Sequence, residues 1–155
     1  MNETHRMSLI QNVEKSLKDF QIFFRMLPRN QKTDSVIKNH ELKDFFGNLT
    51  VIEEDILEMR LKKIINQEHP YLPAIRIENL KIMRNLYQLS LLDLMQHYLV
   101  QKEKILKFIN NIPIYYWERT GVHELEGHVT FEELIRRIIK NDQNNLLVLK
   151  TKFKN

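Results

Sequence analysis

The sequence predicts an all-α protein built as a four-helix bundle. Apolar residues recur at steps of three and four over most of the chain, which is the period of an amphipathic helix. Only three glycines and four prolines occur among 155 residues, so turn-forming positions are few. A chain of this length matches one ordinary domain. We therefore expect a single four-helix-bundle domain over residues 1–155, with long connections between helices two and three and between helices three and four.

The first half of the chain predicts two helices. The first covers residues 5–27 and stops at Pro28, because proline cannot continue a helix. The second covers residues 39–66. Asn48 shares the inner edge of this second helix. The residues expected to face inward on the second helix are Leu42, Phe45, Leu49, Ile52, Ile56 and Met59.

The third helix is expected over residues 78–110 and is the longest. Residues 67–77 contain two prolines and break the helical period, which predicts a long connection before it. A polar Asn-Asn-Ile-Pro sequence at residues 110–113 ends it. Its expected inward residues are Leu80, Met83, Tyr87, Leu91, Leu94, Tyr98, Ile105 and Ile109.

The fourth helix begins at Thr130, because Thr130 and Glu133 have the spacing of a capping box. Following its inward face in steps of three and four leads through two amides, Asn141 and Asn145. An unpaired amide in an apolar core costs on the order of 1–3 kcal/mol, so each needs a polar partner. The complete expected stripe is Phe131, Leu134, Ile138, Asn141, Asn145, and Val148 or Leu149.

Composition narrows the classes of function. The absence of cysteine excludes disulfides, thiolate catalysis and cysteine-based zinc sites. The net charge of +4 is spread along the chain without a nucleic-acid-binding motif. No apolar run approaches the roughly 18 residues of a membrane span, and the first residues do not have the pattern of a signal peptide. We expect a cytoplasmic protein without nucleic-acid or membrane partners.

The closing part of the chain contains a series of motifs, namely Trp117-Glu-Arg-Thr-Gly-Val-His123, Gly127, Thr130, Glu133-Leu134 and Asn141-Asp142-Gln-Asn-Asn145-Leu146. These motifs resemble the closing segment of DinB-like (YfiT-like) four-helix-bundle proteins. The resemblance covers most of the chain and is strongest over residues 110–149. It includes helix two through the residue 68–73 loop, with Glu53 at the family's usual acidic position. The resemblance implies a metal triad of one histidine on helix two and a His-Asp-x-x-His-Leu pattern on the last helix.

Asparagine occupies all three positions onto which this triad falls. The ligand positions correspond to Asn48, Asn141 and Asn145, while Asp142 keeps the family pattern. A neutral carboxamide is a weak ligand, so three of them cannot hold a catalytic transition metal. We therefore expect no metal and no cofactor. The three amides are expected to hydrogen-bond to each other or to line a metal-free ligand pocket.

Three residues are secondary candidates around this site. Glu53 and Asp142 are expected beside the amides as supporting groups. For Trp117 we favour a role in capping the open end of the bundle, with the mouth of the pocket as the functional alternative.

Three functions remain open at this stage. The first is a metal-free protein that binds a small molecule or regulates, expected to be a homodimer. The second is an enzyme with an altered active site, of the thiol-dependent transferase or hydrolase type that the resemblance implies. The third is a structural dimer module. The three asparagines favour the first, and the question of catalysis stays open.

Overall fold

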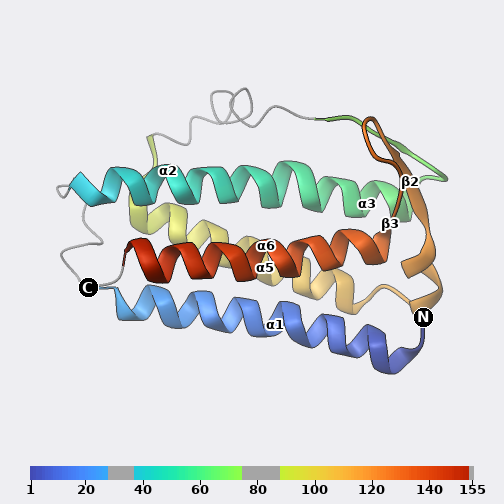
Figure 1. The fold of residues 1–155 in the computed structure, drawn as a ribbon, viewed down its shortest axis with the longest axis horizontal. Helices are drawn as coiled ribbons and strands as arrows, with labels where there is room; N and C mark the ends of the chain where they lie inside the picture. The colour runs from blue at the N-terminus through green and yellow to red at the C-terminus, as the bar shows by residue number, and fades with distance from the viewer. Residues whose placement is uncertain (28–36, 75–87, 154–155) are drawn as a thin grey trace.

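The computed structural model describes residues 1–27, 37–74 and 88–153. These residues form four long helical segments that lie side by side, with a small sheet at one end (Figure 1). The predicted four-helix-bundle architecture is confirmed, together with the long connection between helices three and four. The segments are α1 (Glu3–Met26), the continuous run of α2 (Ile37–Val51), η2 (Ile52–Glu58) and α3 (Met59–Asn66), then α5 (Leu91–Asn110) and α6 (Phe131–Lys152).

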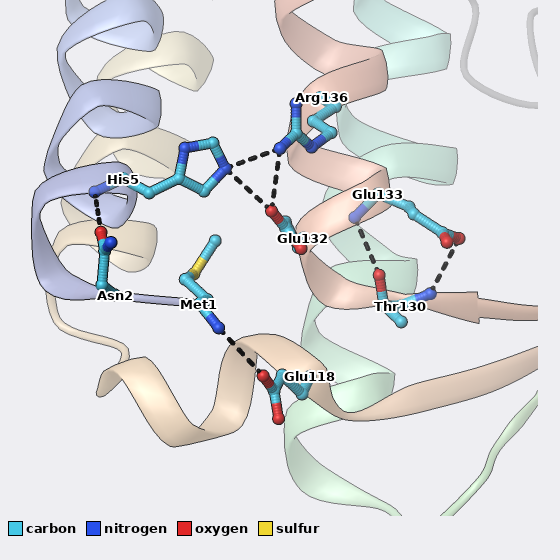
Figure 2. A network of polar contacts seen from close by, with 8 residues as sticks. All are labelled: Met1, Asn2, His5, Glu118, Thr130, Glu132, Glu133 and Arg136. Atoms are coloured by element: carbon cyan, nitrogen blue, oxygen red, sulfur yellow. Dashed lines mark hydrogen bonds and ion pairs between the residues drawn. The ribbon is translucent and has the colours of Figure 1, made fainter.

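The first and fourth helices begin where the sequence provides caps. The Asn2 side chain accepts a hydrogen bond from the backbone N–H of His5 at the start of α1. At the start of α6, Thr130 Oγ1 accepts from Glu133 N, and a Glu133 carboxylate oxygen accepts from Thr130 N. Both bonds of the predicted capping box are present, and each satisfies an N–H that has no partner within its helix. Figure 2 shows both caps.

The second helix is continuous as predicted, but its inward face differs from the predicted one. Phe45 and Ile52 are only half-buried, whereas their neighbours Phe46 and Val51 are fully buried. Seven residues, Ile52–Glu58, then form a π-helix, which has more residues per turn than an α-helix. After this segment the expected inward residue Met59 is 42% exposed, so the predicted stripe is wrong there as well.

The third helix is confirmed from Leu91 onward. Ser90 caps its N-terminus by accepting a hydrogen bond from Asp93 N, and residues 88–90 are not α-helical. The part of the prediction over residues 75–87 lies outside the described residues. The inward residues from Leu91 to Ile109 are buried as expected.

A three-stranded sheet occupies connections that were expected to be loops. The strand β1 (Tyr71–Leu72) pairs in parallel with β2 (Thr120–His123), and β2 pairs antiparallel with β3 (Gly127–Thr130). A 3-10 helix, η4 (Ile114–Glu118), precedes β2. Side chains pack tightly against Gly121, where a Cβ would lie 2.7 Å from Leu72 Cδ1. The sheet thus joins the end of α3 to the start of α6.

The helices pack so that α1 contacts α5 and α6, while α2 contacts α5. The core consists of two separate apolar clusters along the bundle axis. One cluster surrounds Trp117 and Phe131 near the sheet, and the other surrounds Phe20, Phe46 and Tyr98 at the far end. Polar residues separate the two clusters, and they form the candidate site.

Among the described residues, no helix has the combination of length and apolar character that crossing a membrane requires.

A candidate functional site in the polar layer of the bundle

Each helix of the bundle contributes a polar side chain between the two apolar clusters. We call this set the polar layer, and all of its members are buried. Burial of several polar groups at one level is costly unless they satisfy one another, so their arrangement determines what the layer can do. The polar layer consists of Ser16 from α1, Glu53 from η2, Gln101 and Lys102 from α5, and Asp142 from α6.

The Lys102 ammonium lies at the centre of the polar layer. Its Nζ atom is 2.7 Å from Glu53 Oε1 and 2.5 Å from both carboxylate oxygens of Asp142. None of the Lys102 side chain is exposed, and the two carboxylates are 5% and 2% exposed. The rings of Phe20 and Tyr98 lie 6.0 and 5.7 Å from the ammonium, at cation–π distance. One cation is thus enclosed by two anions and two aromatic faces.

Burial and charge act in opposite directions on these groups. Burial, together with the nearby charge of Asp142, raises the pKa of Glu53 to about 7, despite the attraction of Lys102. Burial likewise raises the pKa of Asp142 against the lowering effect of Lys102. Burial alone would lower the pKa of Lys102, but Glu53 and Asp142 outweigh it and the pKa is raised. The Lys102 ammonium therefore stays charged, whereas the Glu53 carboxylate readily takes up a proton near neutral pH.

A second polar pair adjoins the π-helix. The buried Gln101 amide donates a hydrogen bond to the Glu58 carboxylate, and Lys62 Nζ lies 2.7 Å from the same carboxylate. Glu53 and Glu58 both belong to η2, and π-helical turns are frequent at functional sites. The π-helix therefore positions two carboxylates against adjacent residues of α5.

The three asparagines that were expected to converge differ in burial. Asn141 is exposed, so the expectation that it faces the core is wrong. Its neighbour Asp142 takes the buried position, because the inward stripe of α6 advances from Ile138 by four residues. Asn145 is half-buried. Asn48 is also half-buried, with its Oδ1 atom buried and without a hydrogen-bond partner among the described residues.

Of the three secondary candidates, two belong to the polar layer and the third, Trp117, does not. Glu53 and Asp142 do meet, around Lys102, which the sequence analysis did not select. Trp117 is fully buried, and its indole N–H donates to the Ile112 carbonyl. Its ring packs edge-on against Phe131 with centroids 5.2 Å apart. This placement agrees with the capping interpretation, because a fully buried indole does not line an opening.

The polar layer does not fit the metal that the sequence resemblance implies. A metal between Glu53 and Asp142 would occupy the position of the Lys102 ammonium, which already contacts both carboxylates. Zinc sites in proteins have three or four protein ligands, usually including histidine or cysteine. In the described part of the chain, no three histidine, cysteine, aspartate or glutamate side chains lie close enough together to hold a metal. The donor set is therefore that of an internal ion pair.

Comparison with known proteins supports the fold. No family model and no curated protein match the chain. Among solved structures, YfiT from Bacillus subtilis matches with a TM-score of 0.75 over 98% of this chain and 89% of that chain, at 9% sequence identity. That protein is described as a probable metal-dependent hydrolase with an unusual four-helix bundle topology. The chain thus has a YfiT-like four-helix-bundle fold, and at this identity the likeness establishes the fold alone.

Proposed function

We propose that this chain is a metal-independent binding or regulatory protein of the DinB-like superfamily. The observation that carries the proposal is the contact of one buried ammonium, Lys102, with both buried carboxylates. In this proposal Lys102 supplies the positive charge that a metal ion supplies in a metalloenzyme. Unlike a metal, an ammonium has no open coordination position, so it cannot activate a bound water molecule.

Charge balance supports this role for Lys102. Two ionised carboxylates and one ammonium leave one excess negative charge in the core. Because burial raises the pKa of Glu53 to about 7, uptake of one proton near neutrality removes this excess. The polar layer then needs no further cation.

A catalytic alternative follows from the same pKa. A carboxyl group that titrates near pH 7 is suited to general acid–base catalysis. Glu53 is only 4% exposed, however, and its oxygen contacts Lys102. A substrate would first have to open the bundle to reach it. We therefore place binding or regulation ahead of an altered transferase or hydrolase.

Metal analysis of untagged protein tests the proposal. We expect elemental analysis to find no stoichiometric zinc, nickel or iron, and calorimetric titration with zinc or nickel to give no saturable binding. One tightly bound metal per chain would contradict the proposal if it is lost in Asp142→Asn and retained in the matched variant Asp93→Asn. Asp93 is exposed on α5 and lies outside the polar layer.

Hydrolysis of an activated ester and transfer to a small thiol test the catalytic alternative. We expect no rate above that of buffer. A rate whose pH dependence shows a transition near pH 7 would favour the catalytic alternative over the binding proposal if Glu53→Gln removes this rate and Glu103→Gln does not. Glu103 is exposed on α5, so it controls for a change of surface charge.

A further inference from the structure

A groove runs between the C-terminal half of α1 and the N-terminal half of α5. Its volume is about 590 Å³, which lies within the range of roughly 300–1,000 Å³ that is usual for small-molecule sites. The side chains of Phe24 and Met95 are buried and form an apolar floor. Leu92, which is 52% exposed, and Leu99, which is half-buried, form its wall on α5. The groove therefore offers an extended apolar surface on the outside of the bundle.

One charged side chain lines this groove. It is Arg25, in the last turn of α1, and it is exposed. No ion pair of Arg25 with another described residue is present. The other polar lining residues, Gln21 and Gln96, are neutral amides that can donate hydrogen bonds. The groove lining thus carries a single charge, the positive charge of Arg25.

Arg25 makes one end of the groove different from the other, because it places the positive charge at one end only. The helices α1 and α5 run in opposite directions, so Arg25 lies at the same end of the bundle as the N-terminus of α5 (Figure 1). From Leu92 to Leu99 the apolar wall continues away from this end over seven residues, or about 10 Å.

We propose that this groove binds an anionic amphiphile, namely a medium-length alkyl carboxylate. The carboxylate would pair with Arg25, and the alkyl chain would lie along Leu92 and Leu99 over the floor of Phe24 and Met95. A guanidinium binds a carboxylate through two parallel hydrogen bonds, which explains the choice of an anionic head. The inference deepens the proposed binding function and rests on it. It does not depend on the polar layer.

Calorimetric titration with three ten-carbon probes tests this proposal. The probes are decanoate, decan-1-ol and decyltrimethylammonium, each below its micellar concentration. We expect one decanoate per chain, bound about ten-fold more tightly than the alcohol, while the cation does not bind. Arg25→Gln should reduce decanoate affinity to that of the alcohol. Leu92→Asp should abolish decanoate binding, because it places a negative charge on the apolar wall.

Two variants on α6 serve as matched controls. Lys150→Gln removes an exposed cation from the last turn of another helix, and Leu147→Asp places a charge at a position that is 63% exposed. Both should bind decanoate as the parent does. Because Arg25 and Leu92 are exposed, their variants should keep the helical circular dichroism of the parent.

Three outcomes would overturn the proposal. They are equal binding of all three probes, no binding of decanoate, or a dimer in sedimentation experiments that Leu92→Asp converts to a monomer. In the last case a second copy of the chain covers the groove. None of these outcomes alters the metal content of the protein, so failure here is distinct from failure of the metal-independent role.

Discussion

Two charged networks connect α6 to other helices, and they differ in burial. In the polar layer, Lys102 joins Glu53 and Asp142 with at most 5% of any of these side chains exposed. At the sheet end of the bundle, Glu132 joins His5 and Arg136, and the exposed fractions are 25%, 38% and 51% (Figure 2). The contacts are 2.5–2.7 Å long around Lys102 and 3.0 Å long from Glu132 to each partner, so both sets are within ion-pair distance. Burial is therefore the larger difference between the networks.

Solvent makes the two networks behave differently. Water and salt screen the exposed network, so its ion pairs contribute between about 0 and 1 kcal/mol each. In the polar layer, each group has lost its hydration and depends on its partners, so removal of one partner leaves an uncompensated charge. The pKa shifts agree with this difference. Burial dominates at Glu53 and raises its pKa, whereas hydrogen bonds from Arg136 and His5 outweigh burial at Glu132 and lower its pKa.

Lys102→Met gives the largest expected effect. It removes the only cation among the residues of the polar layer and leaves Glu53 and Asp142 facing each other without compensation. Breaking a buried ion pair in this way costs about 3–5 kcal/mol, which we expect as a loss in the free energy of unfolding measured with urea. Lys104→Met, at an exposed position of the same helix, should change it by less than about 0.5 kcal/mol. Equal effects of the two variants would show that the ammonium is not the centre of the layer.

The pH dependence of stability gives the second largest effect. The pKa of Glu53 is raised from 4.5 to about 7, so the folded protein binds the proton more tightly than the unfolded chain does. The stabilising contribution is therefore complete below about pH 4.5 and is lost as the pH rises toward 7. The shift corresponds to about 3 kcal/mol. Urea unfolding at pH 5 and pH 8 should show this decrease.

Glu53→Gln should remove much of the decrease, because a neutral amide resembles the protonated acid. Part of it should remain, since the pKa of Asp142 is raised as well. Carboxylates with lowered pKa values, Glu126 and Glu132, change stability only below about pH 4.5 and do not obscure the measurement. An increase in stability from pH 5 to pH 8 would contradict this assignment.

The exposed network should give the smallest effect. Arg136→Gln removes one partner of Glu132, whose other partner His5 and the surrounding water remain. We expect the free energy of unfolding to fall by less than about 1 kcal/mol, and the difference from the parent to shrink in 1 M salt. A loss as large as that of Lys102→Met, unchanged by salt, would remove the contrast between the two networks.

The fold was largely predictable because its signals are local. Helical periodicity, the stop signal after the first helix and the capping box at Thr130 each act within a few residues, and the structure confirms a first helix that ends at Met26 and both bonds of the capping box. The sheet was not predicted, because β1 and β2 are two and four residues long and pair residues 51 positions apart. Such short strands have no alternation long enough to recognise.

The candidate site was only half predictable, because the choice between adjacent helical positions depends on tertiary packing. From Ile138, a step of three leads to Asn141 and a step of four leads to Asp142, and both residues are polar. The next apolar residue, Leu146, is buried and lies four positions after Asp142, a spacing that favours the second path. Lys102 falls in a gap of seven residues between the buried residues Tyr98 and Ile105, where a helix needs one more inward position. That gap was the available signal for the missed cation.

The pairing of α1 with α6 has a consequence for biosynthesis. The contact between His5 and Glu132 joins residues 127 positions apart, so α1 meets this neighbour only after the intervening residues have been translated. Until then the apolar stripe of α1 lacks one of its native neighbours, and exposed apolar surface on a nascent chain promotes aggregation. Contacts of such high sequence separation also slow folding. We therefore expect chaperones that bind apolar segments to shield α1 until α6 has been synthesised.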